Sequence, residues 1–180
     1  MPAQMPQDQG EVLTTVYSTL PALAEMAGAH LHIRQVTTAA ALDIVRAAKV
    51  RGARVTCGVT PAHFMLSDVA IGDFRTFTRL SPPLRSEADR QAVLAALADG
   101  TITVISSGHD PRGPEDKRLP FADAEPGMAG AETLLPLTLG LVRDGVIPLE
   151  RAFALLAENP ARILGIPGGR LETGADADIA

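Results

Sequence analysis

Four histidines and an aspartate next to a proline are the residues of this chain best suited to metal or proton chemistry. Neutral imidazole and ionised carboxylate groups offer lone pairs that bind zinc or accept a proton. His30 and His32 have the spacing of a metal-binding pair, but the same spacing on a strand describes two partly buried histidines on one face, which we favour. Asp110 precedes Pro111, where an aspartate commonly shapes a turn. The single cysteine, Cys57, lies in an apolar segment and is interpreted as a small buried hydrophobic residue.

The composition is that of an acidic globular protein. Among 180 residues, 46% are hydrophobic and the net charge is −5, with no cluster of Lys and Arg that would neutralise nucleic-acid phosphates. No apolar run approaches the roughly 18 residues that a membrane-spanning helix needs. The polar first ten residues do not resemble a signal peptide, and one cysteine cannot form an internal disulfide. We therefore expect a cytoplasmic protein that binds neither nucleic acid nor membranes.

Three short, apolar, β-branched segments alternate with segments of helical periodicity. The predicted strands are residues 31–36, 54–60 and 101–106, and the predicted helices are residues 11–28, 38–50, 86–98, 131–143, 149–158 and 160–164. Strand–helix units in succession imply parallel strands with right-handed crossovers, although three units cannot close an eight-stranded barrel. The Pro- and Gly-rich segment 108–130 predicts a long surface loop, and loops of this length usually have a function.

Short motifs that follow one another along residues 30–180 resemble the C-terminal part of dihydroorotases, which are cyclic amidohydrolases. These motifs occupy residues 31–38, 59–63 (Val-Thr-Pro-Ala-His), 81–86 (Ser-Pro-Pro-Leu-Arg-Ser), 108–112 (Gly-His-Asp-Pro-Arg), 159–165 (Asn-Pro-Ala-Arg-Ile-Leu-Gly) and 174–179. The resemblance implies an α/β fold in which residues 30–167 form strands six to eight, with their helices, of a TIM-like (β/α)8 barrel. Residues 1–29 would precede the barrel as a loop and helix. Residues 168–180 would begin the return into a small β-sandwich.

Four positions depart from the dihydroorotase pattern. The family holds zinc with His and carboxylate side chains at strand ends, and an Asp after strand eight also serves as the base. In this chain Gln35 occupies the position of the strand-six His ligand, and Gly108 occupies that of the Asp. Ser81 and Arg112 replace an Asn and a His that contact substrate in the family. The resemblance therefore implies no catalytic residue and no metal ligand at these positions, and we expect no bound cofactor.

Other polar residues could retain part of the site. Asp110 is a weak substitute for the missing Asp, and His109 matches a family residue beside the base, in the substrate pocket. His63 keeps one of two strand-seven histidines and is expected to pack or hydrogen-bond rather than bind metal. Arg85 keeps a family arginine, as a salt-bridge partner or an anion contact. The charged run 115–118 lies in the loop that covers the pocket mouth in the family, and it predicts either a solvated surface or a partner contact.

Three functional hypotheses remain open from the sequence. The resemblance favours a non-catalytic dihydroorotase homologue, because metal-less members of the family act as structural partners of aspartate carbamoyltransferase in pyrimidine biosynthesis. The alternative is an active zinc-dependent cyclic amidohydrolase whose remaining ligands lie upstream of this chain. The third is a separate, open α/β binding domain, in which exposed strand edges would favour aggregation or pairing. A homo-oligomer is compatible with each of them.

Overall fold

Three short parallel strands form the centre of the computed structural model, which describes residues 19–176. They are β1 (Leu31–Ile33), β2 (Val55–Val59) and β3 (Val104–Ile105), in the order β1-β2-β3. The prediction of three parallel strands is confirmed, but β1 and β3 are shorter than predicted. Their flanking residues keep isolated hydrogen bonds to β2, such as the one from Val36 N to Gly58 O, without extending the ladder.

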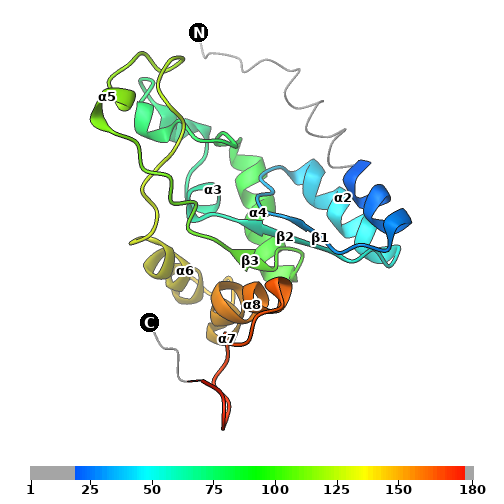
Figure 1. The fold of residues 1–180 in the computed structure, drawn as a ribbon. Helices are drawn as coiled ribbons and strands as arrows, with labels where there is room; N and C mark the ends of the chain where they lie inside the picture. Colours follow the sequence, from blue (N-terminus) through cyan, green and yellow to red (C-terminus); the bar gives the residue numbers. More distant parts are fainter. Residues whose placement is uncertain (1–18, 177–180) are drawn as a thin grey trace.

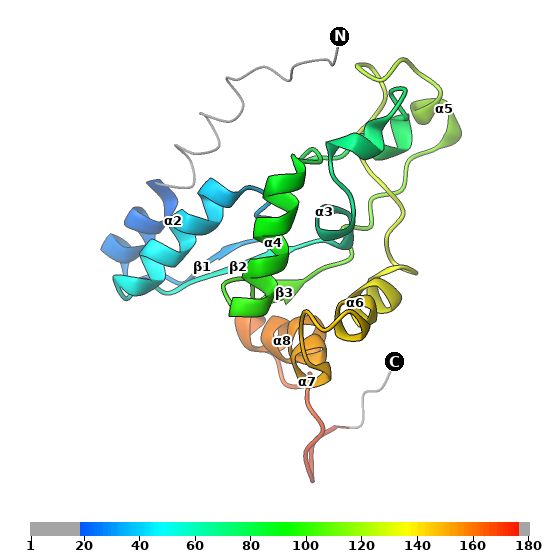
Figure 2. The ribbon, with the colours of Figure 1, turned by 180° about the vertical axis from the view of Figure 1, so that it is seen from behind.

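Two helices cover one face of the sheet, α2 (Ala39–Val50) and α4 (Glu87–Asp99), as Figures 1 and 2 show. Each helix begins within one residue of its predicted start and is capped there, because the hydroxyls of Thr38 and Ser86 accept hydrogen bonds from backbone N–H groups of the first turn. Asp89 Oδ1 also accepts a hydrogen bond from the first N–H of α2 at 2.9 Å, which fixes the two helix starts together. The core between helices and sheet is largely aliphatic, and its fully buried members include Leu42, Val45, Cys57, Val93, Leu97 and Ile105.

The C-terminal helices pack together beside β3 (Figure 1). α6 (Leu134–Arg143) begins at Leu134 rather than at residue 131. The break predicted near residue 159 is wrong, since the π-helix η3 (Ala154–Glu158) joins α7 (Leu149–Phe153) directly to α8 (Asn159–Leu164). Pro160 lies in the first turn of α8, directly after this π-helix.

The remaining connections are long and contain short helices. Residues 66–86 form a connection with two short 3-10 helices, η1 (Asp68–Ile71) and η2 (Thr76–Thr78). The sequence did not predict α3 (Pro61–Met65): Pro61 ends the strand as expected, but it also starts a helix, for which a proline is well suited at the first position. The loop after β3 contains α5 (Pro114–Lys117), and it projects away from α7 and α8 in Figure 1.

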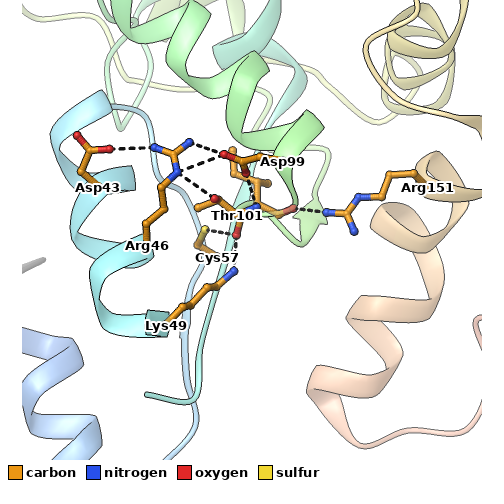
Figure 3. A network of polar contacts seen from close by, with 8 residues as sticks. Asp43, Arg46, Lys49, Cys57, Asp99, Thr101 and Arg151 are labelled. Carbon is orange, nitrogen blue, oxygen red and sulfur yellow. Dashed lines mark hydrogen bonds and ion pairs between the residues drawn. The ribbon is translucent and has the colours of Figure 1, made fainter. Parts of the chain in front are cut away.

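A network of charged and polar groups lies at the end of the sheet where β2 and β3 begin (Figure 3). Arg46 of α2 contacts Asp99 Oδ2 at 2.8 Å and Thr101 Oγ1 at 3.1 Å. Lys49 Nζ donates to Thr101 O at 2.7 Å, and the Cys57 thiol contacts the same carbonyl. Burial raises the pKa of Cys57 to about 11, so the thiol stays protonated, as expected of a buried hydrophobic residue. The network joins α2, β2 and the α4–β3 connection.

The two ends of the chain are described in part. Residues 19–27 are helical and Gly28, with a φ of +61°, ends this helix as predicted, while the rest of the predicted helix and the loop before it lie outside the described residues. Residues 168–176 form turns, and residues 177–180 of the predicted β-sandwich return are not described. Within 19–176, no helix combines the length and apolar character that crossing a membrane requires.

Candidate functional site

A pocket of about 280 Å³ lies where the three strands end. Its wall includes Gln35, which follows β1, Thr60, which follows β2, and Ser107 and Gly108, which follow β3. The carboxyl ends of parallel strands meet at one edge of a sheet, and in (β/α)8 barrels this edge carries the active site. This pocket is therefore the candidate functional site.

The pocket brings together most, but not all, of the positions singled out from the sequence. Gln35, Ser81, Gly108 and Asp110 line it. His109 and Arg112, which were assigned to the substrate pocket by family match, are not among the lining residues. They contact the surrounding loop instead, as their hydrogen bonds show.

Gly108 has a conformation and an environment that disfavour a side chain. Its φ is +61°, in the left-handed region that L residues rarely adopt. A Cβ at this position would lie 2.7 Å from Cγ2 and 3.1 Å from Cβ of Thr60. The methyl group of Thr60 therefore occupies the space into which a side chain at residue 108 would begin to extend.

His63 is buried and both of its ring nitrogens are engaged. Nδ1 contacts the Thr60 hydroxyl at 2.7 Å, and Nε2 lies 3.0 Å from the carbonyl oxygen of Pro82. Since a carbonyl can only accept, Nε2 carries the proton and Nδ1 accepts from Thr60. Burial lowers the pKa of His63 below the usual 6.5; the hydrogen bond with Pro82 opposes this change and the charge of Arg85 adds to it. His63 thus packs and hydrogen-bonds, as predicted, and holds the 81–82 segment at the pocket.

Asp110 is paired with the residue that replaces the family's histidine. Its Oδ2 accepts a hydrogen bond from Arg112 Nη2 at 2.8 Å, and Arg112 Nε donates to the carbonyl of Pro126 at 2.9 Å. The guanidinium occupies one of the carboxylate oxygens and brings a positive charge close to it, which opposes the binding of a metal cation there. The pairing therefore works against Asp110 as a substitute for the missing aspartate.

His109 fixes the return of the loop toward α6. Its Nδ1 accepts hydrogen bonds from the backbone N–H groups of Gly130 and Ala131, both at 3.1 Å. Residues 109 and 128 also form an isolated bridge, and Asp110 N donates to Met128 O at 2.9 Å. Cβ atoms at Gly127 and Gly130 would collide with the carbonyl oxygens of Asp110 and Ser107, so these glycines permit the close approach. His109 is thus a loop-fixing residue.

The burial of Lys117 corrects the prediction that residues 115–118 form either a solvated surface or a partner contact. Its side chain is 5% exposed, and Nζ donates to the carbonyls of Glu125 at 2.7 Å and Thr76 at 3.1 Å. Burial, together with the charges of Arg112 and Arg79, lowers the pKa of Lys117. This side chain therefore joins the long loop to η2, while Glu115 and Arg118 are exposed as predicted.

Comparison with known families places these features in context. The sequence profile of the amidohydrolase family matches residues 19–180. The chain belongs to the amidohydrolase family. Over 157 residues it is 45% identical to the dihydroorotase of Syntrophotalea carbinolica and 48% identical to that of Syntrophus aciditrophicus. These 157 residues are 87% of this chain and 37% of each relative. It is 41% identical to a Pseudomonas aeruginosa protein named dihydroorotase-like protein. The chain thus spans a little over a third of these relatives.

Solved amidohydrolases share the fold. The dihydropyrimidinase of Brevibacillus agri superposes with a TM-score of 0.85 at 25% identity, and the L-hydantoinase of Arthrobacter aurescens with 0.86 at 27% identity. In both cases 92% of this chain matches 38% of the other. The prediction of a partial TIM-like amidohydrolase barrel is confirmed, and these matches do not favour a separate open α/β domain.

Amidohydrolases typically use metal, but the pocket residues of this family member do not fit zinc. Gln35 offers a neutral amide, Gly108 offers no side chain, and the Asp110 carboxylate is paired with Arg112. No group of three or more His, Cys, Asp or Glu side chains within residues 19–176 could hold a metal ion. His30 and His32 lie at the other end of β1, where both contact the Thr56 hydroxyl, at 3.0 and 2.9 Å.

Several pocket residues were not predicted to belong to this amidohydrolase site. Thr60 and Ser107 contribute hydroxyls, and Met128 and Leu137 contribute apolar surface. Thr60 is the last residue of one predicted strand and Ser107 directly follows another, so their place at the carboxyl ends was a usable signal. The sequence contained no signal for the approach of residues 127–130 to β3, because this approach depends on the path of the loop through space.

Proposed function

We propose that this chain is the C-terminal part of a dihydroorotase-like protein that does not hydrolyse ring amides, and that the protein acts as a structural partner of aspartate carbamoyltransferase. The observation that carries the proposal is the backbone at Gly108. This residue stands where the family's Asp acts as ligand and base, and its φ of +61° and the contact with Thr60 would strain the backbone and displace Thr60 if a side chain were present there. The loss is thus built into the backbone as well as into the sequence.

The rest of the pocket supports the same conclusion. Opening a cyclic amide requires an activated water, a polarised carbonyl and a general base. Gln35 cannot accept a proton from water at neutral pH, His63 uses both nitrogens for structure, and Asp110 is held by Arg112. The segments that shape the barrel are nevertheless intact, which is what a structural role would need.

Metal content and turnover test the absence of catalysis. We expect the purified protein to contain less than stoichiometric zinc and to neither open dihydroorotate nor close carbamoyl aspartate, even with added zinc. Stoichiometric zinc together with ring-opening turnover would contradict the proposal and favour the zinc-dependent alternative.

Co-elution tests the structural role. Mixed at micromolar concentrations with the aspartate carbamoyltransferase of the same organism, the protein is expected to elute in a complex larger than either component alone. Separate elution of the two proteins would refute the partnership without bearing on turnover.

A further inference from the structure

One lobe of the molecule exposes several large apolar side chains. It consists of residues 68–79, with η1 and η2, and residues 114–123, with α5, and these segments lie side by side in Figures 1 and 2. Val69 is 78% exposed and Phe77 67%, while Leu119 is about half exposed. The chain has five phenylalanines, and three of them belong to this lobe. Clustered aromatic side chains on a surface are typical of protein–protein interfaces.

The lobe is fixed from within although its outer surface is exposed. Lys117 Nζ donates to the carbonyls of Thr76 and Glu125, and the Thr76 hydroxyl donates to the Lys117 carbonyl. The rings of Phe74 and Phe121 meet edge to face, with centroids 5.9 Å apart. Phe74 has a φ of +57°, which bulky residues rarely adopt and which persists only where the surrounding structure holds it. The apolar side chains are therefore preorganised, which lowers the entropy lost on binding.

Unpaired charges of both signs surround these side chains. Asp68, Asp73, Arg75 and Arg118 are exposed, and within residues 19–176 none of the four forms an ion pair. A surface that carries both signs complements a second copy of itself, because a twofold axis can bring the acidic groups of one copy to the basic groups of the other. The charges thus favour self-association over a partner of one dominant charge.

The apolar area of the lobe also suits a dimer. Val69, Phe74, Phe77 and Leu119 together expose on the order of 400 Å², since an aromatic side chain covers about 150–250 Å² when fully exposed. An ordinary interface buries about 800 Å² per partner, a little over half of it non-polar. The exposed apolar side chains are therefore about sufficient for the centre of such an interface.

We propose that this lobe binds a second copy of the chain across a twofold axis, with Val69, Phe74 and Phe77 at the centre of the contact and the charged side chains around it. None of residues 68–79 and 114–123 lines the pocket at the strand ends. The contact therefore leaves the pocket free, and the proposal does not depend on the absence of catalysis.

Sedimentation equilibrium of the purified protein, from micromolar to submillimolar concentration, tests the contact. A monomer–dimer equilibrium is expected, and Phe77→Asp and Val69→Asp should each raise the Kd of the dimer at least about tenfold, because each buries an unpaired carboxylate. Val50→Asp is the matched control: Val50 of α2 is also strongly exposed but lies outside the lobe, so its Kd should not change. Far-UV circular dichroism checks that each variant is folded.

Charge reversal tests the complementarity of the rim. Arg75→Asp should weaken the dimer, because acidic groups would then face acidic groups across the axis, and adding Asp73→Arg to the same chain should restore part of the affinity. A double variant that dimerises more weakly than Arg75→Asp alone would contradict charge pairing between the copies.

Three further outcomes would overturn the proposal. The first is a monomer at every concentration, and the second is a dimer whose Kd neither Phe77→Asp nor Val69→Asp changes. The third is an equal effect of Val50→Asp, which would reflect added charge rather than the lobe. A monomer that loses a complex with aspartate carbamoyltransferase on Phe77→Asp would assign the lobe to that partner instead, so this proposal can fail while the proposed function stands.

Discussion

At the end of the sheet where the strands begin, Arg46 and Lys49 of α2 donate hydrogen bonds to Asp99 and Thr101, at and after the end of α4 (Figure 3). At the end where the strands finish, the polar part of the pocket wall consists mostly of hydroxyls and an amide, with His63 and Asp110 beside them. In a (β/α)8 barrel the first end serves stability and the second serves chemistry. This chain has a charged network at the first end, and its second end is the one where the resemblance to dihydroorotases predicts missing ligands.

The two ends of the sheet differ in what their side chains contribute to the fold. The interactions of Arg46 and Lys49 connect segments that are distant in the sequence, so losing one would weaken the fold. The polar groups at Gln35 and Gly108 lie at the opposite end of the sheet from these interactions. The proposed structural role needs only the first end, because the connections there do not depend on the pocket.

Restoring the aspartate is expected to have the largest effect and to break the comparison at the pocket end. Gly108→Asp combines a left-handed backbone with a contact to Thr60, so it should lower the free energy of unfolding by about 2–4 kcal/mol and restore no turnover. Gly145→Asp is the matched control, because Gly145 has a φ of +72° but no atom lies within 4 Å of the place that its Cβ would take; about 1 kcal/mol is expected there. Urea unfolding measures the free energy of unfolding of both variants. A similar loss in the two would show that the contact with Thr60 does not contribute to the strain at residue 108.

Removing a charge at the other end sharpens the comparison. Asp99→Ala leaves Arg46 and the Thr101 N–H without their acceptor, and water compensates in part because the Asp99 side chain is 45% exposed. We expect a loss of about 1–2 kcal/mol in the free energy of unfolding. Asp43→Ala removes the other partner of Arg46, at 74% exposure, and should cost about 0.5 kcal/mol or less. Equal costs for the two variants would contradict a stabilising role for the network.

The features predicted correctly from the sequence are those that local chemistry determines. Thr38 caps α2, Gly28 ends the preceding helix, and the three strands are parallel, because caps, left-handed glycines and strand–helix alternation act within a few residues. Gln35 and Gly108 gather for an equally general reason, since they follow β1 and β3 and the carboxyl ends of parallel strands share an edge.

The features that were missed depend on contacts between distant segments. The burial of Lys117 requires η2 to lie beside the long loop, and the role of His109 requires the return of residues 130–131. The contact between Thr60 and Gly108 joins the ends of β2 and β3. Because of it, a side chain at residue 108 is disfavoured by the structure as well as absent from the sequence. Periodicity and spacing along the chain carry no information about such contacts.

The smallest expected effect is a pH dependence that originates at the pocket end. Burial lowers the pKa of His63, so the folded protein binds fewer protons than the unfolded chain between the folded pKa and about 6.5. The contribution of His63 to stability is therefore complete above pH 6.5 and is lost as the pH falls toward the folded pKa. The Tm should decrease between pH 7.5 and 5.5, and less so in His63→Gln, which cannot titrate but can still donate to the Pro82 carbonyl. His32, whose pKa is also lowered by burial and by the charge of His30, would supply the remaining slope. An identical decrease in His63→Gln would mean that protonation of His63 does not disturb its contacts with Thr60 and Pro82.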